Sequence, residues 1–460
     1  MRAATEFGEA TDDAENLATA EMLAARLDRV PVGKFHRRLL GVIGAGMFFD
    51  SFDLYLAGAV LGTLLHDKYS TLAENAQFIS MTFVGMVIGA IAAGILGDRF
   101  GRRFTYQFNL AIFGVGSLAC AVAPDMAWLI GARFVTGIGL GAEIVIGYAT
   151  MIEFVPPTHR GRWAALLSFV TNLGLLASML MGWLVIPPFG WRWMFVFAGV
   201  GAFFVLWLRK SMPESPRWLA ARGRMAEAEQ VICSIERESG LPPGYTEVAA
   251  LGAKRPLLTR LSRHELARRL MLGSLLQIVA GVASYGFVVW VPTFLVKQGV
   301  NINGSLGQSV LMSLGGPFGA GIGFLLCDHI KRRPAIIGAS LLAVVCGMVF
   351  SQANTTPMAV ASGFVMFSLL FFLVANVVAG YVPELFPTPI RMRANGTCSM
   401  VGRFATIGIP YAVLALFNFG GKPAVLVGVT ACLLIQAVAV WAFGPETSRL
   451  SLDVVGVQRN

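Results

Sequence analysis

Residues 39–65 read LLGVIGAGMFFDSFDLYLAGAVLGTLL, an apolar run whose only charged residues are Asp50 and Asp53. The run exceeds the roughly 20 residues that a helix needs to cross a bilayer core of ~30 Å. A carboxylate at the middle of a membrane helix costs at least ~2.5 kcal/mol on insertion scales. Asp50 and Asp53 are three positions apart, so they share one helix face, on which two charges would repel each other. We therefore predict a membrane helix that faces a polar central cavity and holds a proton on at least one aspartate.

The composition is that of an integral membrane protein. Of 460 residues, 56% are hydrophobic and 13% are charged, whereas about 25% are charged in soluble domains. The net charge of +10 would suggest nucleic acid in a soluble protein, but here cytoplasmic loops rich in Lys and Arg explain it. We therefore expect contact with a lipid bilayer and none with nucleic acid. The six cysteines have no paired or metal-ligand spacing, so we expect no metal site.

Apolar runs recur along the chain, six before and six after one polar insert. They cover about 39–65, 76–97, 104–123, 128–154, 161–186, 193–210, 269–296, 306–330, 334–351, 357–383, 394–417 and 423–444. We predict an all-α membrane protein made of a cytoplasmic arm (1–38), a six-helix bundle (39–210), a cytoplasmic linker (211–268), a second six-helix bundle (269–444) and a cytoplasmic tail (445–460).

The connectors between these runs predict the orientation in the membrane. Basic clusters follow the second, fourth, eighth and tenth runs, whereas the intervening connectors hold one Lys or Arg each at most. Because basic residues are retained on the cytoplasmic side, we predict that both termini and the linker are cytoplasmic. The expected location is the bacterial inner membrane, which the chain crosses many times.

The two halves of the chain repeat each other at a nearly constant offset. Three pairs of segments carry the repeat: Asp98 with Asp328, residues 153–162 with 384–393, and residues 213–215 with 445–447. Three pairs of matching segments separated by nearly the same number of residues indicate an internal duplication. Two parallel repeats with a central site between them are typical of alternating-access transporters.

Residues 97–103, GDRFGRR, resemble the signature loop of the major facilitator superfamily. The second-half copy, residues 327–333, has lost the glycines. Residues 133–141, 153–162, 213–218 and 384–393 resemble further motifs of that superfamily, so the resemblance covers most of the chain. It implies the major facilitator fold, with 12 transmembrane helices in two pseudo-symmetric six-helix bundles.

The charged residues of these motifs are predicted to form a cytoplasmic gate. Their acids can pair with arginines across the cytoplasmic face and hold the two halves closed on the inside while the outside is open. The predicted gate residues are Asp98, Arg99, Arg102, Glu153, Arg160, Arg162, Asp328, Arg332, Glu384 and Arg391. In an alternative interpretation the arginines only set topology and bind lipid headgroups, but this does not explain the neighbouring acids.

Three segments resemble the aromatic acid:proton symporters and the bacterial niacin transporters. They are FDSFD (49–53), YGFVVWVPTFL (285–295) and PELFPT (383–388). Sugar porters carry paired Gln and Asn residues in their seventh helix, where this chain offers only Gln277. The resemblance therefore implies import of a small aromatic monocarboxylate, such as nicotinate or a hydroxybenzoate, together with protons.

Asp53 and Arg133 are the pair that the resemblance to proton-coupled porters implies for coupling. A nearby arginine favours the ionised carboxylate, whereas desolvation after the pair separates favours the protonated one. Proton uptake is then linked to conformation. We favour Asp53 as the proton carrier and place Asp50 second. Glu143 is either a further protonation site or a partner for a pyridine nitrogen.

Arg403 is predicted to bind the substrate carboxylate, because a guanidinium suits bidentate carboxylate binding. Its counterpart in the first repeat, Asn172, is expected to face it at equal depth. Alternatively, Arg403 neutralises Glu143 or an aspartate. Further candidates for stacking on or bonding to the substrate are Phe49, Tyr148, Tyr285, Trp290, Asn376, Tyr381 and Gln277, although aromatic residues often only pack.

Other functions fit parts of the sequence. A proton-coupled sugar or polyol porter would need hydroxyl-binding residues on the seventh and tenth helices, which we do not find. A drug or cation exporter would hold its cargo at Asp50, Asp53 and Glu143, but Arg403 would repel a cation. A transporter-like receptor would need a signalling domain larger than the linker. No phosphate loop or nucleophile elbow indicates an enzyme, and we expect no cofactor. A monomer suffices for this mechanism.

Overall fold

The computed structural model describes residues 22–23, 25–156, 159–242, 262–326, 330–353 and 355–447. The first half of the chain forms α2 (Lys34–His66), α3 (Leu72–Phe100), α4 (Arg102–Ala121), α5 (Met126–Phe154), α6 (Arg160–Phe189) and α7 (Arg192–Leu208). A short turn η1 (Arg209–Ser211) and two short helices, α8 (Pro216–Ala221) and α9 (Met225–Glu238), follow.

The second half contains several interrupted helices. Its elements are α10 (Arg263–Gly281), η2 (Val282–Phe287), η3 (Val288–Trp290), α11 (Val291–Lys297), α12 (Ile302–Ser313), α13 (Gly315–Leu326), α14 (Arg332–Ser351), α15 (Thr356–Val374), η4 (Ala375–Tyr381), α16 (Val382–Glu384) and α17 (Thr388–Phe443). The stretches η2 and η4 are π-helical, a form that often occurs at functional sites.

The described helices account for twelve membrane spans. Ten helical stretches are long and apolar enough to cross a bilayer, and α7 is a shorter apolar helix. The last of the ten, α17, contains two spans, because the backbone leaves helical geometry at Gly420 and Gly421. The predicted fold class, an all-α membrane protein with two six-helix bundles, is thereby confirmed.

Several helices extend beyond the apolar runs that predicted them. The first span begins at Lys34 rather than near residue 39, and α10 begins at Arg263, inside the predicted linker. Hydropathy marks only the part of a helix inside the hydrocarbon core, whereas capping residues set its end. Ser262 caps α10, and Thr71 and Glu74 form a capping box at α3.

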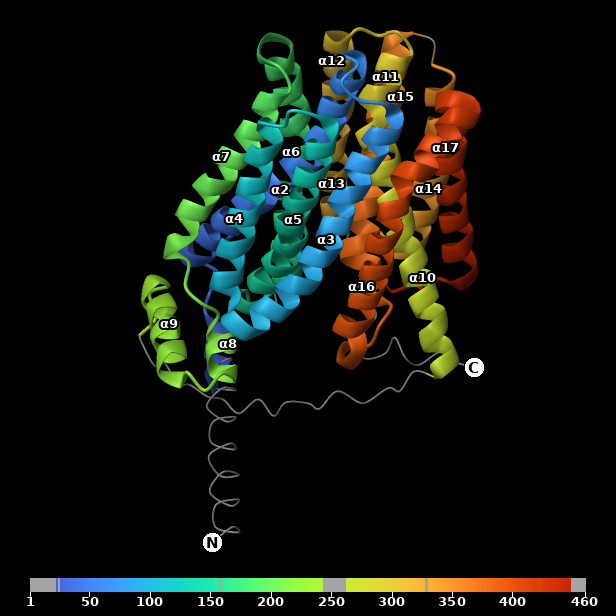
Figure 1. Ribbon diagram of the computed structural model, residues 1–460. Helices are drawn as coiled ribbons and strands as arrows, with labels where there is room; N and C mark the ends of the chain where they lie inside the picture. The colour runs from blue at the N-terminus through green and yellow to red at the C-terminus, as the bar shows by residue number, and fades with distance from the viewer. Residues whose placement is uncertain are drawn as a thin grey trace.

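The two bundles lie side by side, and α8 and α9 lie beneath one end of the first bundle (Figure 1). We call this end of the molecule the linker end and the opposite end, where α11 and α12 lie, the far end. Contacts between the bundles join α2 to η3 and α11, α6 to α12 and α13, and α3 to α17.

Named contacts between the bundles lie toward the far end. The hydroxyl of Ser80 donates to the carbonyl of Ile407 at 2.7 Å. Gly58 packs against the carbonyl of Val289, and a side chain larger than hydrogen at that position would come within 2.8 Å of it. The bundles are therefore tightly packed where these helices approach the far end.

Candidate transport site

The most deeply buried ion pair of the first bundle joins α2 to α5. Nη1 of Arg133 lies 2.5 Å from Oδ2 of Asp53, and the two side chains are 1% and 0% exposed. Arg133 also donates to Thr82 at 3.2 Å, and Ser117 donates to Asp53 at 3.4 Å. The structure thus brings together the two residues that the sequence predicts as a pair.

A second buried ion pair, which the sequence did not predict, joins α5 to the end of α7. Nη2 of Arg209 lies 2.5 Å from Oε1 of Glu143, and both side chains are 1% exposed. The same guanidinium donates to the carbonyls of Val42 and Ile43, each at 3.3 Å. It also lies over the Tyr106 ring, 4.4 Å from its centroid.

The sequence signal for Arg209 was weak. It is one arginine at the end of an apolar run, next to Lys210, where basic residues commonly mark the cytoplasmic boundary. Only the packing of α7 against α2 shows that its side chain turns inward. In the alternative interpretation Arg403 neutralised Glu143, but the structure gives Glu143 a different partner, Arg209.

Asp50 lies beside this second pair and has no bonding partner of its own. Its side chain is buried, and neither carboxylate oxygen has a hydrogen-bond partner among the described residues. The charged groups that act on it are Glu143, Arg209 and Asp53. The two aspartates of α2 therefore have different surroundings, since Asp53 is paired and Asp50 is not.

Arg403 is a half-buried cation of α17 without an ion-pair partner in the described part of the chain. Its Nη1 atom is buried and makes no hydrogen bond there, and Tyr285 is its electrostatic neighbour. Asn172, its predicted counterpart, donates to the carbonyl of Ser168 in its own helix at 2.8 Å. Within the described residues, no contact joins Asn172 to Arg403.

Tyr285 stands in an aromatic cluster at the junction of the bundles. Its ring is stacked on Tyr55 with centroids 6.3 Å apart, and Phe83 meets it edge-on at 4.6 Å. Tyr55 also contacts Phe371 of the second bundle at 6.2 Å. Because these rings come from α2, α3, η2 and α15, the cluster closes the space between the bundles.

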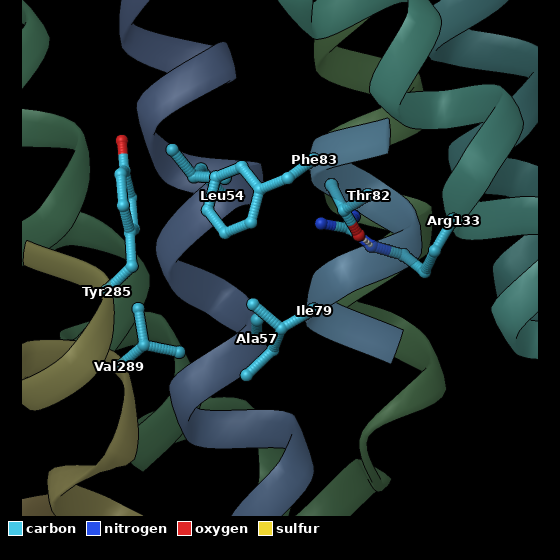
Figure 2. Close-up of a pocket in the computed structure, with 8 residues that line it drawn as sticks. All are labelled: Leu54, Ala57, Ile79, Thr82, Phe83, Arg133, Tyr285 and Val289. Carbon is cyan, nitrogen blue, oxygen red and sulfur yellow. Dashed lines mark hydrogen bonds between the residues drawn. The ribbon is translucent and has the colours of Figure 1, made fainter. Parts of the chain in front are cut away.

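A small cavity adjoins this cluster. It is lined by Leu54, Ala57, Ile79, Thr82, Phe83, Arg133, Tyr285 and Val289. Figure 2 shows Tyr285 and Val289 on one side, facing Leu54 and Ala57 of α2, with Arg133 bonded to Thr82 on the other. Arg133 and Tyr285 thus line one space.

Other predicted substrate residues of the first bundle lie in packed surroundings. The ring of Phe49 fills the space beside Gly201 and contacts Phe197 at 6.2 Å. Tyr148 packs in a separate apolar cluster and lies beside Ser168. Neither is brought to Arg403.

The remaining candidates belong to the second bundle. Gln277 donates to Ser399 at 3.2 Å, which places it between α10 and α17. Trp290 is buried and stacked on Phe294 with centroids 6.1 Å apart. Tyr381 donates to the carbonyl of Pro445 at 2.8 Å, so its hydroxyl joins η4 to the segment that follows α17.

The predicted gate residues of the first bundle pair with one another. Arg102 lies 3.1 Å from Asp98 and 3.2 Å from Glu153. The N-terminus of α4 is held by Glu214, which accepts the backbone N–H of Arg102 at 2.9 Å. Arg99 lies over the Phe100 ring at 5.3 Å.

The second bundle repeats this arrangement. Arg332 lies 3.2 Å from Glu384 and donates to Asn376 at 3.3 Å, while Glu446 accepts its backbone N–H at 3.0 Å. The Arg102 pairs thus lie within the first bundle, and the Arg332 pair lies within the second.

The rest of the predicted gate is less defined. Arg391 donates to the carbonyl of Phe386 at 3.2 Å, and Arg162 is exposed. Asp328 lies outside the described residues, and the side chain of Arg160 is not described.

Two six-helix bundles side by side, the first of which holds two buried ion pairs, have the architecture of a membrane transport protein. Comparison with known families identifies the family: the model of the Major Facilitator Superfamily matches residues 43–410. The chain therefore belongs to the Major Facilitator Superfamily. It is a multi-pass secondary transporter and not an enzyme.

Three similar proteins show how far the likeness extends. The chain is 36% identical to the inner membrane metabolite transport protein YdjE of Escherichia coli, over 95% of this chain and 98% of that one. It is 32% identical to the niacin transporter NiaP of Acinetobacter baylyi, over 95% and 100%. The xylose transporter XylE of E. coli, in a partially occluded inward-open conformation, has a TM-score of 0.73 and 17% identity, covering 90% of this chain and 99% of that one. At this identity XylE shows the fold alone.

Proposed function

We propose that this transporter imports a small aromatic monocarboxylate, of the nicotinate or hydroxybenzoate type, with protons across the bacterial inner membrane. The observation that carries the proposal is the guanidinium of Arg403, whose Nη1 atom is buried and has no hydrogen-bond partner among the described residues. A buried cation without a counter-ion is costly, so a bound anion would supply the missing charge. The likeness to a niacin transporter supports this class of substrate.

In the proposed site, Arg403 binds the carboxylate and Tyr285 contacts the ring. Arg403 and Tyr285 are electrostatic neighbours, and in the proposed site one ligand contacts both. An offset-stacked or edge-on arrangement with Tyr285 would stabilise the ring. Gln277, bonded to Ser399 one turn before Arg403, lies near enough to supply a polar contact. Asn172, Phe49, Tyr148, Trp290, Asn376 and Tyr381 remain predictions outside this minimal site.

Coupling to protons is assigned to Asp53 and Arg133. The pair is closed, and the adjacent guanidinium stabilises the carboxylate of Asp53 against the cost of its burial. When the bundles rearrange and Arg133 moves away, Asp53 is desolvated without its partner and takes up a proton. Arg133 and Tyr285 line the same cavity, so a ligand on Tyr285 and the ion pair are physically adjacent.

The proposed orientation follows the basic connectors, with both termini and the linker end in the cytoplasm. The contacts between bundles toward the far end then close the outside. A cation exporter is disfavoured because Arg403 would repel its cargo, and a sugar porter because the seventh span offers only Gln277.

The test is ligand binding to purified protein with Arg403→Ala. Thermal stabilisation and binding are measured for nicotinate, nicotinamide, 4-hydroxybenzoate, xylose and a quaternary ammonium compound. We expect stabilisation by the carboxylates. Loss of a charge-assisted hydrogen bond, worth about 1.5–3 kcal/mol, should raise the Kd for nicotinate by about 10- to 100-fold and leave nicotinamide nearly unchanged.

Lys422→Ala is the matched control, because Lys422 is a buried cation of the same element, α17, but packs on Phe350 at 4.5 Å. It should leave nicotinate binding unchanged. Equal loss of the acid and its amide in Arg403→Ala would make Arg403 a structural residue. Stabilisation by xylose or by the cation instead would disprove the substrate class.

A further inference from the structure

The first bundle contains a buried charge cluster that the proposed coupling pair does not use. It consists of Asp50 on α2, Glu143 on α5, Arg209 after α7 and Tyr106 on α4. All four side chains are buried. Glu143 follows Arg133 on α5 by ten positions, or ~15 Å at the helical rise, so the cluster extends from the coupling pair toward the linker end.

The charges within this cluster do not balance. It holds two carboxyl groups and one guanidinium, and the charged groups that act on Asp50 are Glu143, Arg209 and Asp53. Asp53 has its own partner in Arg133, so it brings no spare cation. With every group ionised, the cluster would carry a net negative charge in a region that excludes water.

The hydrogen bonds show where the imbalance lies. Glu143 is bonded to Arg209 through Oε1, whereas its Oε2 and both oxygens of Asp50 have no partner among the described residues. A buried carboxylate that lacks both a counter-ion and hydrogen bonds is strongly destabilised relative to its protonated form. Of the two acids, Asp50 is therefore the one that holds a proton.

The backbone around the cluster is shaped to admit Arg209. Gly46 lies one turn before Asp50 on α2, and a methyl group there would overlap both the Arg209 guanidinium and Oε1 of Glu143. The phenol ring of Tyr106 lies over the guanidinium of Arg209. The charges of Glu143 and Glu153 act on the Tyr106 hydroxyl. Glu153 belongs to the predicted gate at the linker end, so polar groups continue from Asp50 toward that surface.

We propose that Asp50, Glu143 and Arg209 form a second proton-binding site, which carries one proton per transport cycle in addition to the proton on Asp53. In the conformation described here the proton is on Asp50 and Glu143 is ionised beside Arg209. Release breaks the O–H bond of Asp50 and passes the proton to water at the linker end. The cluster then holds two carboxylates and one guanidinium, so release requires that water reaches Asp50 and solvates the extra negative charge. Arg209 is a positioning residue, since it holds Glu143 and does not carry the proton itself.

This inference rests on the proposed function, because it concerns the stoichiometry of the same transport. One proton moving with a monocarboxylate transfers no net charge, whereas two protons transfer one positive charge. A membrane potential therefore drives uptake only if the proton of the second site crosses the membrane together with the first proton and the substrate. A potential of 100 mV, negative inside, corresponds to an accumulation of roughly 50-fold for one charge.

The experiment measures uptake of labelled nicotinate into proteoliposomes, driven either by a potassium diffusion potential or by a pH gradient. We expect the wild-type protein to accumulate nicotinate with either driving force. Asp50→Asn should lose the response to potential and keep the response to the pH gradient, because the amide imitates a permanently protonated carboxyl. Ser178→Ala, which alters a buried hydroxyl of α6 outside the cluster, should respond like the wild type.

Uptake by the wild type that responds to the pH gradient but not to the potential would overturn the second site and leave the proposed function standing. The second site is also overturned if Asp50→Asn still responds to the potential. If the wild type takes up no nicotinate, the proposed function fails. The infrared band of protonated carboxyl groups in the purified protein then tests the second site independently. The band must weaken in Asp50→Asn and persist in Asp53→Asn. An unchanged band in Asp50→Asn rejects the second site.

Discussion

At the scale of single residues, the burial of Asp53 and Arg133 explains why the pair can respond to conformation. Both side chains are fully enclosed, and the Phe78 ring lies 5.0 Å from the guanidinium carbon. No solvent screens the interaction in this state, so its strength changes greatly when the distance changes. An exposed pair on the surface would change little.

Asp53→Asn should separate proton coupling from substrate movement. The amide can keep a hydrogen bond to Arg133 but cannot bind a proton. We expect proton-driven accumulation of substrate in proteoliposomes to fall to background, while exchange of labelled for unlabelled substrate continues. Asn109→Ala, a change at a buried polar residue of α4, serves as the control and should retain accumulation. Accumulation that survives in Asp53→Asn would rule out Asp53 as the carrier.

Single residues also show the limit of prediction from sequence. Asp53 and Arg133 were predictable, because a charge inside an apolar run is rare and costly. Arg209 was not, because a basic residue at the end of a run is common there. Its role depends on the direction of one side chain, which the packing of α7 against α2 and Gly46 determines.

At the scale of elements, the described end of the predicted arm packs against α9. Leu23 and Ile232 are buried in an apolar cluster together with Leu219. Arg26 joins the two segments, since it lies 2.6 Å from Glu229 and 2.8 Å from Glu236. These contacts hold α9 against the segment that leads into α2.

Arg26→Ala should release α9 from the arm. The change removes the guanidinium that Glu229 and Glu236 share, and losing one member of a buried pair costs about 3 kcal/mol. Hydrogen exchange of the α9 amides should accelerate, by about two orders of magnitude at that cost. Arg224→Ala is the control, because its pair with Glu227 is half-exposed and contributes little. Unchanged exchange in Arg26→Ala would show that the apolar cluster alone holds α9.

The same contact has an expected pH dependence. Burial tends to raise the pKa of Glu229, but the hydrogen bonds from Arg26 and Cys233 outweigh it and leave the pKa lowered from 4.5. A carboxyl group with a lowered pKa stabilises the folded contact above its ordinary pKa and loses that contribution as the pH falls through the lowered value. Docking of α9 should therefore weaken only below about pH 4.5.

At the scale of the whole molecule, the contacts between the bundles determine which side of the membrane is closed. Gly58 and Gly62 of α2 face the seventh span near the far end. A Cβ atom at Gly58 would lie 2.8 Å from the carbonyl oxygen of Val289, whereas one at Gly62 would lie 3.5 Å from Pro292. The first position does not tolerate a methyl group without a shift of backbone, and the second does.

Gly58→Ala should therefore favour opening at the far end, and Gly62→Ala should not. The measurement is the labelling rate of a single introduced cysteine near Val289 by a membrane-impermeant reagent added from outside. We expect a several-fold faster rate in Gly58→Ala, since a shift of about 1 kcal/mol changes a population about fivefold. Equal rates in both variants would mean that this contact does not govern closure.

The sequence by itself determined the membrane spans, their division into two repeated halves and the superfamily. These features depend on local quantities, namely hydropathy over one helix length, the charge of the connectors and short motifs. It also singled out Asp50, Asp53, Arg133, Glu143 and Arg403, because ionisable residues stand out in apolar runs.

Only the tertiary structure decided which of these charges are partners. It paired Asp53 with Arg133 and Glu143 with Arg209, and it left Asp50 and Arg403 without partners in the described chain. It also placed Tyr381 on Pro445 and Phe49 beside Gly201, where the sequence predicted substrate contacts. The physical reason is that an ion pair or a packed ring depends on the rotation and crossing of helices distant in the chain, and neither quantity is encoded in the hydropathy of a single helix.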